Sequence, residues 1–273
     1  MQQSAEQAAQ AGQTSFRSFE LDANRRPDPV GITAEEWAVR VDLAAAYRLC
    51  AMHGWDDLIY THISARVPGT SGHFLVNPLG LAFDEITASS LVKIDYDGNV
   101  IGDTPYRPNA AGFVIHGGVH QAREDMGSVM HLHTIHGMAL SMLPDGLQPL
   151  SQHALRFYGR IGYHDYEGIA LSTGERERIV AALGQHRALV LRNHGTLTVG
   201  KTVGGAFVEM YYLEKAAQAQ ITAQSTGQRL LVPDPQVCAL TDQQWQEDFS
   251  SDANREWPAL LRKLDRLDPS YKN

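Results

Sequence analysis

The sequence is organised around one short stretch, Ser128-Val129-Met130-His131-Leu132-His133-Thr134. In an extended strand successive side chains point to opposite faces of the sheet, so His131 and His133 share one face. Their Cα atoms are then about 6–7 Å apart, given the rise per residue of a strand. Two imidazoles at that spacing can lean toward one cation at the distance of about 2.0–2.1 Å that zinc prefers.

The composition limits the kinds of partner that the chain can bind. It has 273 residues, 43% of them hydrophobic, and a formal net charge of −8 at pH 7. Its acidic residues are scattered, and there is no basic stripe for nucleic acid and no cationic face for a membrane surface. We therefore expect a small-molecule substrate, with neither nucleic acid nor membrane as a partner.

Cysteine usage and hydropathy predict the compartment. The two cysteines, Cys50 and Cys238, are too few for a disulfide framework or a thiolate metal cage. No apolar run approaches the ~20 residues of a membrane span, and the Gln- and Ala-rich start lacks the order of a secretion signal. These features predict a soluble protein of the reducing cytoplasm.

Composition and periodicity divide the chain into three parts. Residues 1–30 are rich in Gln, Ala and Ser and show little periodicity, which predicts a flexible lead-in. Residues 31–227 alternate between helical and strand patterns, which predicts one α/β domain. In residues 228–273 the Pro, Asp and Gln content rises, and we expect a C-terminal extension of turns and short helices, packed on the domain or trailing from it.

Within the domain, several elements have clear sequence signals. The capping box that starts at Thr33, followed by apolar residues at four-residue spacing, predicts a helix over 34–52 that ends at Gly54. Alternating or β-branched runs and turn residues predict a hairpin of two strands. The expected strands are 59–67, 73–76, 91–94, 128–134 and 188–191, and the further helices are 110–123, a short one ending near 143, one beginning at 172–175, and 202–226.

A third histidine completes a candidate metal site. His194 directly follows a predicted buried strand and precedes Gly195, where the backbone can bend sharply. Together with His131 and His133 it would form a three-histidine site with open positions, which is the catalytic rather than the structural pattern for zinc. Paired histidines on a strand face also occur without metal, so the pattern alone leaves both interpretations open.

A set of ordered motifs resembles the class II aldolase/adducin family. The motifs are Gly54-Trp55, Thr61-His62-Ile63-Ser64, Asn77-Pro78-Leu79-Gly80, Asn109-Ala110-Ala111-Gly112-Phe113 with His116, His131-Leu132-His133-Thr134 and Arg192-Asn193-His194-Gly195. The similarity runs from about residue 35 to residue 227. The segments 88–94 and 163–166 resemble the adducin-head branch more than the sugar-phosphate aldolases.

The resemblance implies a fold, an assembly and a metal. The fold is a three-layer α/β/α sandwich around a central mixed, largely antiparallel sheet, and the assembly is commonly a four-fold ring, a homotetramer with sites near the interfaces. The resemblance also implies a divalent metal, usually zinc, on His131, His133 and His194. Manganese, iron and cobalt stay open, because imidazole suits several of these ions.

In the enzymatic branch of the family the metal acts as a Lewis acid that stabilises an enediolate. The family's aldolases supply a base from a carboxylate four residues before the helical histidine, and that position here is Gly112. The residues that help to hold phosphate would fall at Ala110 and Ala111, which have no side-chain donor. An asparagine expected in the first loop is His62. These departures argue against a standard sugar-phosphate aldolase.

Other residues would then have to carry the protons and the substrate. We expect His116 and His153 as the catalytic residues, because imidazole titrates near neutrality. The expected substrate-binding residues are His62, Asn77 and Gly80. For His116 and His153 the plain alternative is a structural histidine.

Two acidic residues are further candidates for the missing carboxylate. Asp165 and Glu167 lie between candidate strands, where a solvated loop charge is the competing interpretation.

Two classes of function follow. The first is a metal-dependent lyase, epimerase or decarboxylase that acts on a small hydroxy-carbonyl compound. The second is a non-catalytic, adducin-head-like oligomerisation or binding module that retains the metal site. Three retained histidines favour the enzyme, because a scaffold gains nothing from imidazoles facing a pocket. Gly112, Ala110 and Ala111 favour the module or a changed substrate, and we expect the enzyme.

Overall fold

The centre of the molecule is a seven-stranded sheet with the strand order β3-β2-β1-β4-β7-β6-β5. The computed structural model describes residues 31–108, 110–168, 173–248 and 255–273. Neighbouring strands run antiparallel, except that β5 and β6 are parallel. The strands are β1 (His62–Arg66), β2 (His73–Val76), β3 (Val92–Asp95), β4 (Ser128–Leu132), β5 (Ile161–His164), β6 (Ala188–Leu191) and β7 (Gly195–Gly200).

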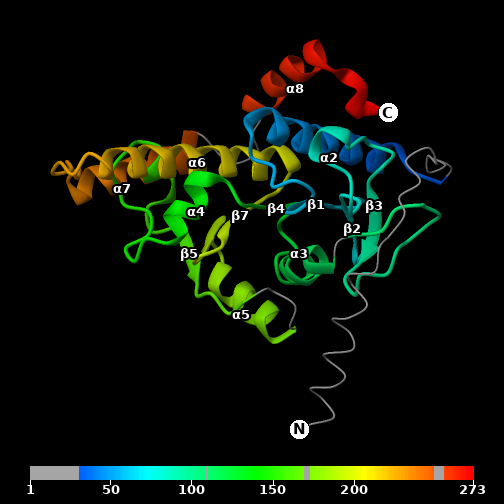
Figure 1. Ribbon diagram of the computed structural model, residues 1–273, viewed down its shortest axis with the longest axis horizontal. Coiled ribbons are helices and arrows are strands. Elements are labelled where there is room, and N and C mark those ends of the chain that lie inside the picture. Colours follow the sequence, from blue (N-terminus) through cyan, green and yellow to red (C-terminus); the bar gives the residue numbers. More distant parts are fainter. Residues whose placement is uncertain (1–30, 109, 169–172, 249–254) are drawn as a thin grey trace, which may run out of the picture.

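Helices cover both faces of the sheet, which confirms the three-layer α/β/α sandwich. One layer contains α2 (Ala34–His53) and α6 (Val203–Gln224), with α8 (Glu256–Leu267) outside them (Figure 1). The opposite layer contains α3 (Ala110–Ala122) and α5 (Thr173–Leu183). The short helix α4 (Ile135–Ser141) follows β4, and α7 (Pro235–Asp248) follows α6. Among the described helices none is both long and apolar enough to cross a membrane.

Helix α2 begins and ends where its sequence predicts. The Thr33 side chain accepts a hydrogen bond of 3.1 Å from the backbone N–H of Glu36 and so caps the first turn. Gly54 adopts the left-handed conformation, with φ at 67°, and its N–H bonds back to the last turn. The expected hairpin is also present as β1 and β2, with Ser64 paired to Val76.

The alternation along β4 determines which layer each side chain meets. Met130 and Leu132 belong to the core formed with α2 and α6, whereas Val129 packs in the core with α3 and α5. His131 therefore projects on the side of α3 and α5, because residues two apart on a strand share a face. Its backbone pairs with His62 of β1 on one side and Leu197 of β7 on the other.

The sequence patterns did not predict strand β7. It occupies Gly195–Gly200 and pairs with both β4 and β6 in the middle of the sheet. The run Thr196-Leu197-Thr198-Val199 is short, and glycine at both ends resembles a turn between β6 and the long helix. Its neighbour β6 directly precedes it, but its other neighbour β4 lies far away in the sequence, and pairing on both sides makes it a strand.

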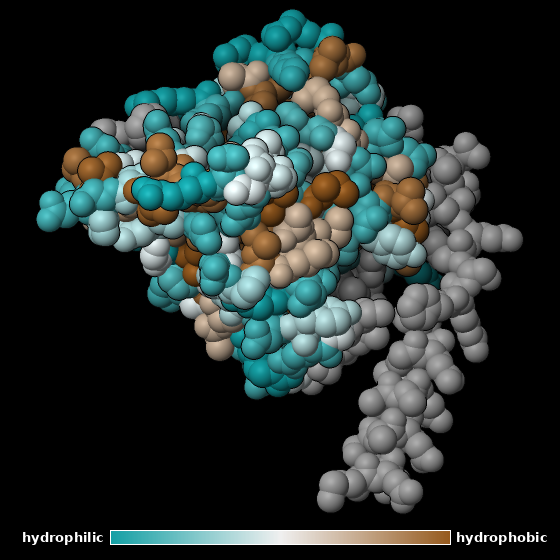
Figure 2. All heavy atoms as spheres, turned by 60° about the vertical axis from the view of Figure 1, so that its left-hand side comes forward, coloured by the Kyte–Doolittle hydropathy of each residue, from teal (hydrophilic) through white to brown (hydrophobic). Residues whose placement is uncertain are grey.

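The described part of the C-terminal segment contacts the domain. Trp257 of α8 is buried, and its indole N–H donates to Asp42 of α2 over 3.1 Å. On the end formed by α6 and α7, hydrophobic groups lie among hydrophilic ones (Figure 2). The exposed apolar residues of this region include Leu231, Val232, Val237 and Leu240. The division of the chain at residue 227 stays a prediction, and the lead-in over 1–30 lies outside the described residues.

Candidate metal centre

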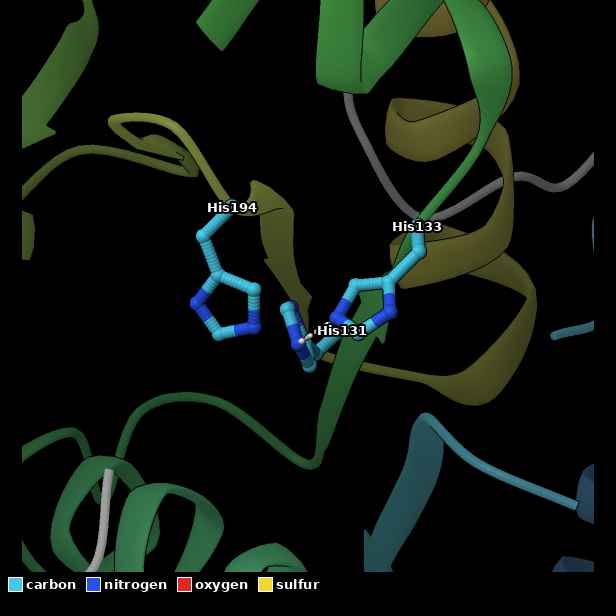
Figure 3. A group of neighbouring side chains, drawn as sticks. All are labelled: His131, His133 and His194. Atoms are coloured by element: carbon cyan, nitrogen blue, oxygen red, sulfur yellow. Dashed lines mark hydrogen bonds between the residues drawn. The ribbon is translucent and has the colours of Figure 1, made fainter. Parts of the chain in front are cut away.

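Three imidazoles converge at the end of β4 (Figure 3). His131 and His133 come from β4 and the residue after its end, and His194 comes from the turn between β6 and β7. One ring nitrogen of each lies within 4.8 Å of the others. The Nε2 atoms of His131 and His133 are 3.2 Å apart. The structure thus brings together the three residues predicted as ligands.

The turn that carries His194 has a specific local cause. Asn193 adopts a left-handed conformation with φ at 56°, and the N–H of His194 donates to the carbonyl of Leu191 over 3.1 Å. A Cβ atom at Gly195 would lie 2.6 Å from the Leu132 carbonyl oxygen and 3.1 Å from Cδ2 of His133. Only glycine therefore lets the two histidine-bearing segments approach this closely.

Hydrogen bonds fix the tautomers of two rings. The Nδ1 of His131 lies 3.0 Å from the carbonyl oxygen of Thr196, which only accepts, so Nδ1 carries the proton and Nε2 is free as a ligand. The Nδ1 of His133 lies 2.8 Å from a carboxylate oxygen of Asp57. This oxygen also only accepts, so Nδ1 of His133 carries a proton as well. Carbonyl and carboxylate partners of this kind orient histidines in metal sites.

The spacing and charge state of the donors fit a divalent ion. Two ligands on a tetrahedral ion with bonds of about 2.0–2.1 Å are separated by about 3.3 Å, close to the distance between the two Nε2 atoms. Burial lowers the pKa of His131 well below its usual value, and the neighbouring histidines lower it further. The pKa of His194 is lowered to about 4, mainly by burial and further by the neighbouring His133 and His164. Both rings are therefore neutral at pH 7, the form that binds metals.

Unusual backbone conformations surround this cluster. Among the described residues, three that are not glycine have positive φ: Leu58 at 53°, Thr61 at 64° and Asn193 at 56°. They lie next to Asp57, next to His62 and next to His194, respectively. Such conformations are costly and occur preferentially at functional sites.

A second group of histidines is buried behind the first. The ring of His62 stacks on His131 with centroids 6.2 Å apart and meets the ring of His116 edge-on at 5.6 Å. Among the described residues, neither ring nitrogen of His62 has a hydrogen-bond partner, and neither does Nε2 of His116. Ser64 Oγ lies 2.7 Å from His116 Nδ1 and 2.8 Å from His120 Nε2. His116 thus meets the metal centre through His62.

The other predicted site residues lie in different surroundings. Asn77 is buried, with its Oδ1 accepting from the Tyr47 hydroxyl over 2.9 Å and its Nδ2 without a partner. Gly80 lies in a turn with φ at 96°. His153 is exposed, and its ring lies 5.2 Å from that of Tyr212, with no contact to the three imidazoles among the described residues. The roles of these residues stay predictions.

Neither alternative carboxylate contacts the three imidazoles among the described residues. The Asp165 side chain is 92% exposed and lies 3.6 Å from Arg192. Glu167 binds Arg178 with both oxygens. Asn109 lies outside the described residues, and the positions 110–112 are described only as the first turn of α3.

Sequence patterns did not predict the roles of Asp57 and of the Thr196 carbonyl group. Asp57 follows Gly54-Trp55-Asp56 in a loop without periodicity, and its carboxylate meets His133 across a separation of 76 residues. The backbone acceptor at Thr196 depends on β7, which was not predicted. A carboxylate directly after the Gly54-Trp55 motif was the one signal available.

The buried histidines predict acid lability. Burial, with a contribution from Arg66, lowers the pKa of His120 to about 3 in the folded protein. In the unfolded chain the pKa is about 6.5, so below that pH the unfolded state binds a proton that the folded state does not. The protein therefore becomes less stable as pH falls. We expect protonation of His120 in the unfolded chain to lower the free energy of unfolding by about 2 kcal/mol between pH 7 and pH 5.

Urea unfolding between pH 7 and pH 5 measures this effect. The variant His120→Gln should show a shallower decline of the unfolding free energy with falling pH, and the exposed-histidine control His153→Gln should decline as the unchanged protein does. An unaltered pH slope in His120→Gln would contradict the assignment.

Comparisons with known proteins agree with the fold. Residues 41–221 match the family model for the class II aldolase and adducin N-terminal domain. A Caulobacter vibrioides protein named as a candidate class 2 aldolase is 53% identical over 241 residues, which cover 88% of this chain and 94% of that protein. Alpha-adducin of Rattus norvegicus is 40% identical over 217 residues, 77% of this chain and 29% of that protein.

Two solved structures extend the comparison to the fold. An aldolase II superfamily protein from Pseudomonas syringae has a TM-score of 0.86 and 49% identity, covering 89% of this chain and 98% of that one. L-fuculose 1-phosphate aldolase from Glaciozyma antarctica has a TM-score of 0.79 and 30% identity, covering 91% and 97%. The chain therefore belongs to the class II aldolase and adducin family.

Proposed function

We propose that this protein is a divalent-metal-dependent enzyme of the aldolase, epimerase or decarboxylase type that acts on a small hydroxy-carbonyl compound. The observation that carries the proposal is the convergence of three imidazoles, neutral at His131 and His194, with the Nε2 atoms of His131 and His133 at the spacing of metal ligands. Zinc is the ion that we propose for this site, and the cytoplasm is the proposed compartment.

Residues around that site have different proposed roles. A divalent ion bound by the three histidines supplies Lewis-acid stabilisation of negative charge on substrate oxygens. The Thr196 carbonyl and Asp57 orient two of the ligands. We propose that His62, whose ring nitrogens have no hydrogen-bond partner in the described part of the chain, hydrogen-bonds the substrate. Asn77, whose amide nitrogen has no partner among the described residues, and Gly80 complete the proposed substrate contacts.

The proton carrier that we propose is His116. It is fully buried, its Nδ1 is bound to Ser64, and its ring lies against His62. Burial, with His62 and His120, lowers the pKa of His116 well below its usual value, so its neutral imidazole would pass a proton to or from the substrate through His62 rather than store one, in place of the carboxylate that Gly112 lacks. The missing donors at Ala110 and Ala111 argue against a standard sugar-phosphate substrate. His153 stays a predicted proton donor.

Metal content and proton exchange test the proposal. Protein purified without a histidine tag should carry close to one divalent ion per chain by plasma emission. Nuclear magnetic resonance should then detect solvent deuterium entering the carbon next to the carbonyl in at least one member of a panel of small hydroxy-ketones. Less than a quarter of an equivalent of metal, even after zinc is added, would contradict the proposal.

Asp57 provides a sharper test of how the ligands are oriented. We expect Asp57→Ala to weaken zinc binding about 10–100-fold, because partners of this kind contribute that much to metal affinity. The exposed neighbour Asp56 gives a control with the same loss of charge, and Asp56→Ala should bind zinc as the unchanged protein does. Competition with a chromogenic chelator measures both affinities, and equal values for the two variants would refute the role of Asp57.

A second candidate function is an assembly module, which the match to alpha-adducin and the residues at 110–112 favour. In that case the protein forms a ring without turnover, and His131→Ala leaves its size in solution unchanged. Light scattering on both proteins, with the exchange assay in parallel, separates the two functions. Metal-dependent exchange that disappears in His131→Ala supports the enzyme.

A further inference from the structure

A cavity of about 420 Å³ lies at the end of the sheet opposite to the three histidines. The loops that precede β4, β5 and β6 line it, and these three strands all begin at that edge. The strands are four or five residues long, which places about 13–17 Å between their two ends. Residues of α6 and α7 complete the wall. The cavity is therefore separate from the candidate metal centre.

Positive charge predominates in this arginine cavity, which we name for its lining residues Arg123, Arg156, Arg160 and Arg187. Its lining also includes two carboxylates, Asp125 and Glu209, and the apolar walls come from Met126, Phe157 and Trp245. The volume lies in the range of small-molecule sites, and because most of the lining is polar or charged, the cavity suits a charged ligand.

Two of the four arginines are each paired with a carboxylate through two hydrogen bonds. The guanidinium of Arg123 donates to both oxygens of Asp125, over 2.8 and 2.9 Å, and to the carbonyls of Gly184 and His186. Arg160 donates to both oxygens of Asp242 from α7, over 2.7 and 2.9 Å. A carboxylate therefore balances the positive charge of each of these two side chains.

The other two share one carboxylate. Arg156 donates to Glu209 through two hydrogen bonds of 2.9 and 3.0 Å, and both side chains are 5% exposed. The Oε1 atom of Glu209, which accepts one of these bonds, also lies 3.6 Å from the guanidinium of Arg187. That distance is too long for a hydrogen bond. Glu209 therefore compensates one of two positive charges, and Arg187, whose side chain is 33% exposed, keeps its donors available at the cavity.

We propose that the arginine cavity binds a small organic anion through a phosphate or carboxylate group held by Arg187. A guanidinium presents paired N–H donors in a fixed fork that matches the two oxygens of either group. The excess positive charge beside a buried ion pair favours an anion over a neutral ligand. This site goes beyond the proposed reaction and does not depend on it.

Equilibrium dialysis of the metal-loaded protein with labelled inorganic phosphate, and separately with labelled succinate, tests the proposal. At least one probe should bind at one equivalent per chain. Arg187→Gln should weaken that binding at least tenfold, and Arg187→Lys, which keeps the charge without the fork, should weaken it less. The exposed arginine Arg229 lies outside the lining, and Arg229→Gln should bind as the unchanged protein does.

The same measurement distinguishes the cavity from the metal centre. Binding that persists in His131→Ala and is lost in Arg187→Gln supports the arginine cavity. Binding lost in His131→Ala and kept in Arg187→Gln assigns the anion to the metal centre and overturns the proposal. Absence of binding by both probes at millimolar concentration overturns it as well. Circular dichroism and thermal unfolding confirm that each variant is folded.

Discussion

Replacing His131 by alanine should reduce the metal content from one ion per chain to about a tenth of that or less, because two imidazoles seldom hold zinc without a third ligand. The ring of His131 is one corner of a nearly equilateral triangle, 4.9 Å from that of His133 and 4.8 Å from that of His194, which are themselves 4.8 Å apart. Its backbone pairing with Leu197 does not depend on the side chain, so the sheet should survive the change. Plasma emission on the purified variant measures the outcome.

A second histidine supplies the control for this experiment. His73 lies at the start of β2, at the other end of the β1–β2 hairpin from His62, and is not among the three clustered residues. His73→Ala should therefore keep a full equivalent of metal. A folded His131→Ala protein with an undiminished metal load would show that the ligand assignment is wrong.

Removing the side chain of Arg156 should destabilise the protein by about 3–5 kcal/mol, the usual cost of breaking a buried ion pair from one side. Its partner Glu209 is 3% exposed in the unchanged protein, and the guanidinium of Arg187 lies 3.6 Å from it, beyond hydrogen-bond distance. A buried carboxylate in that state loses its solvation without gaining a hydrogen bond. Urea unfolding of Arg156→Ala at pH 7 measures the loss.

Two comparisons make this result specific to burial. The Arg160–Asp242 pair has the same two-bond geometry but a guanidinium side chain that is 50% exposed, so Arg160→Ala should cost about 1 kcal/mol or less. The double replacement Arg156→Met with Glu209→Leu should recover most of the stability, because it leaves no buried charge. If Arg156→Ala is as stable as Arg160→Ala, the buried pair does not stabilise the fold as we infer.

Local patterns predicted most elements of the fold. The capping residue and apolar spacing of α2 lie within one helix, and the alternation around His131 lies within one strand, so each could be read from neighbouring residues. The family resemblance supplied the layer arrangement and the grouping of His194 with the β4 pair. These features depend on short stretches of chain or on ordered motifs.

The features that were missed depend on contacts between distant parts of the chain. Strand β7 is short, and its position between β4 and β6 is determined by pairing on both sides. Asp57 meets His133 because a loop with two left-handed residues folds toward the end of β4. The burial of His116 behind His62 is likewise a product of the sheet and α3 together. No periodicity in the sequence carries this information.

The close approach at Gly195 also limits how the histidine cluster can change over evolutionary time. A single added carbon there would collide with the main chain of Leu132, which cannot rotate out of the way as a side chain can. Contact between main-chain atoms thus limits the distance between the turn that carries His194 and the end of β4. Any side chain at position 195 would therefore push the turn that carries His194 away from the end of β4.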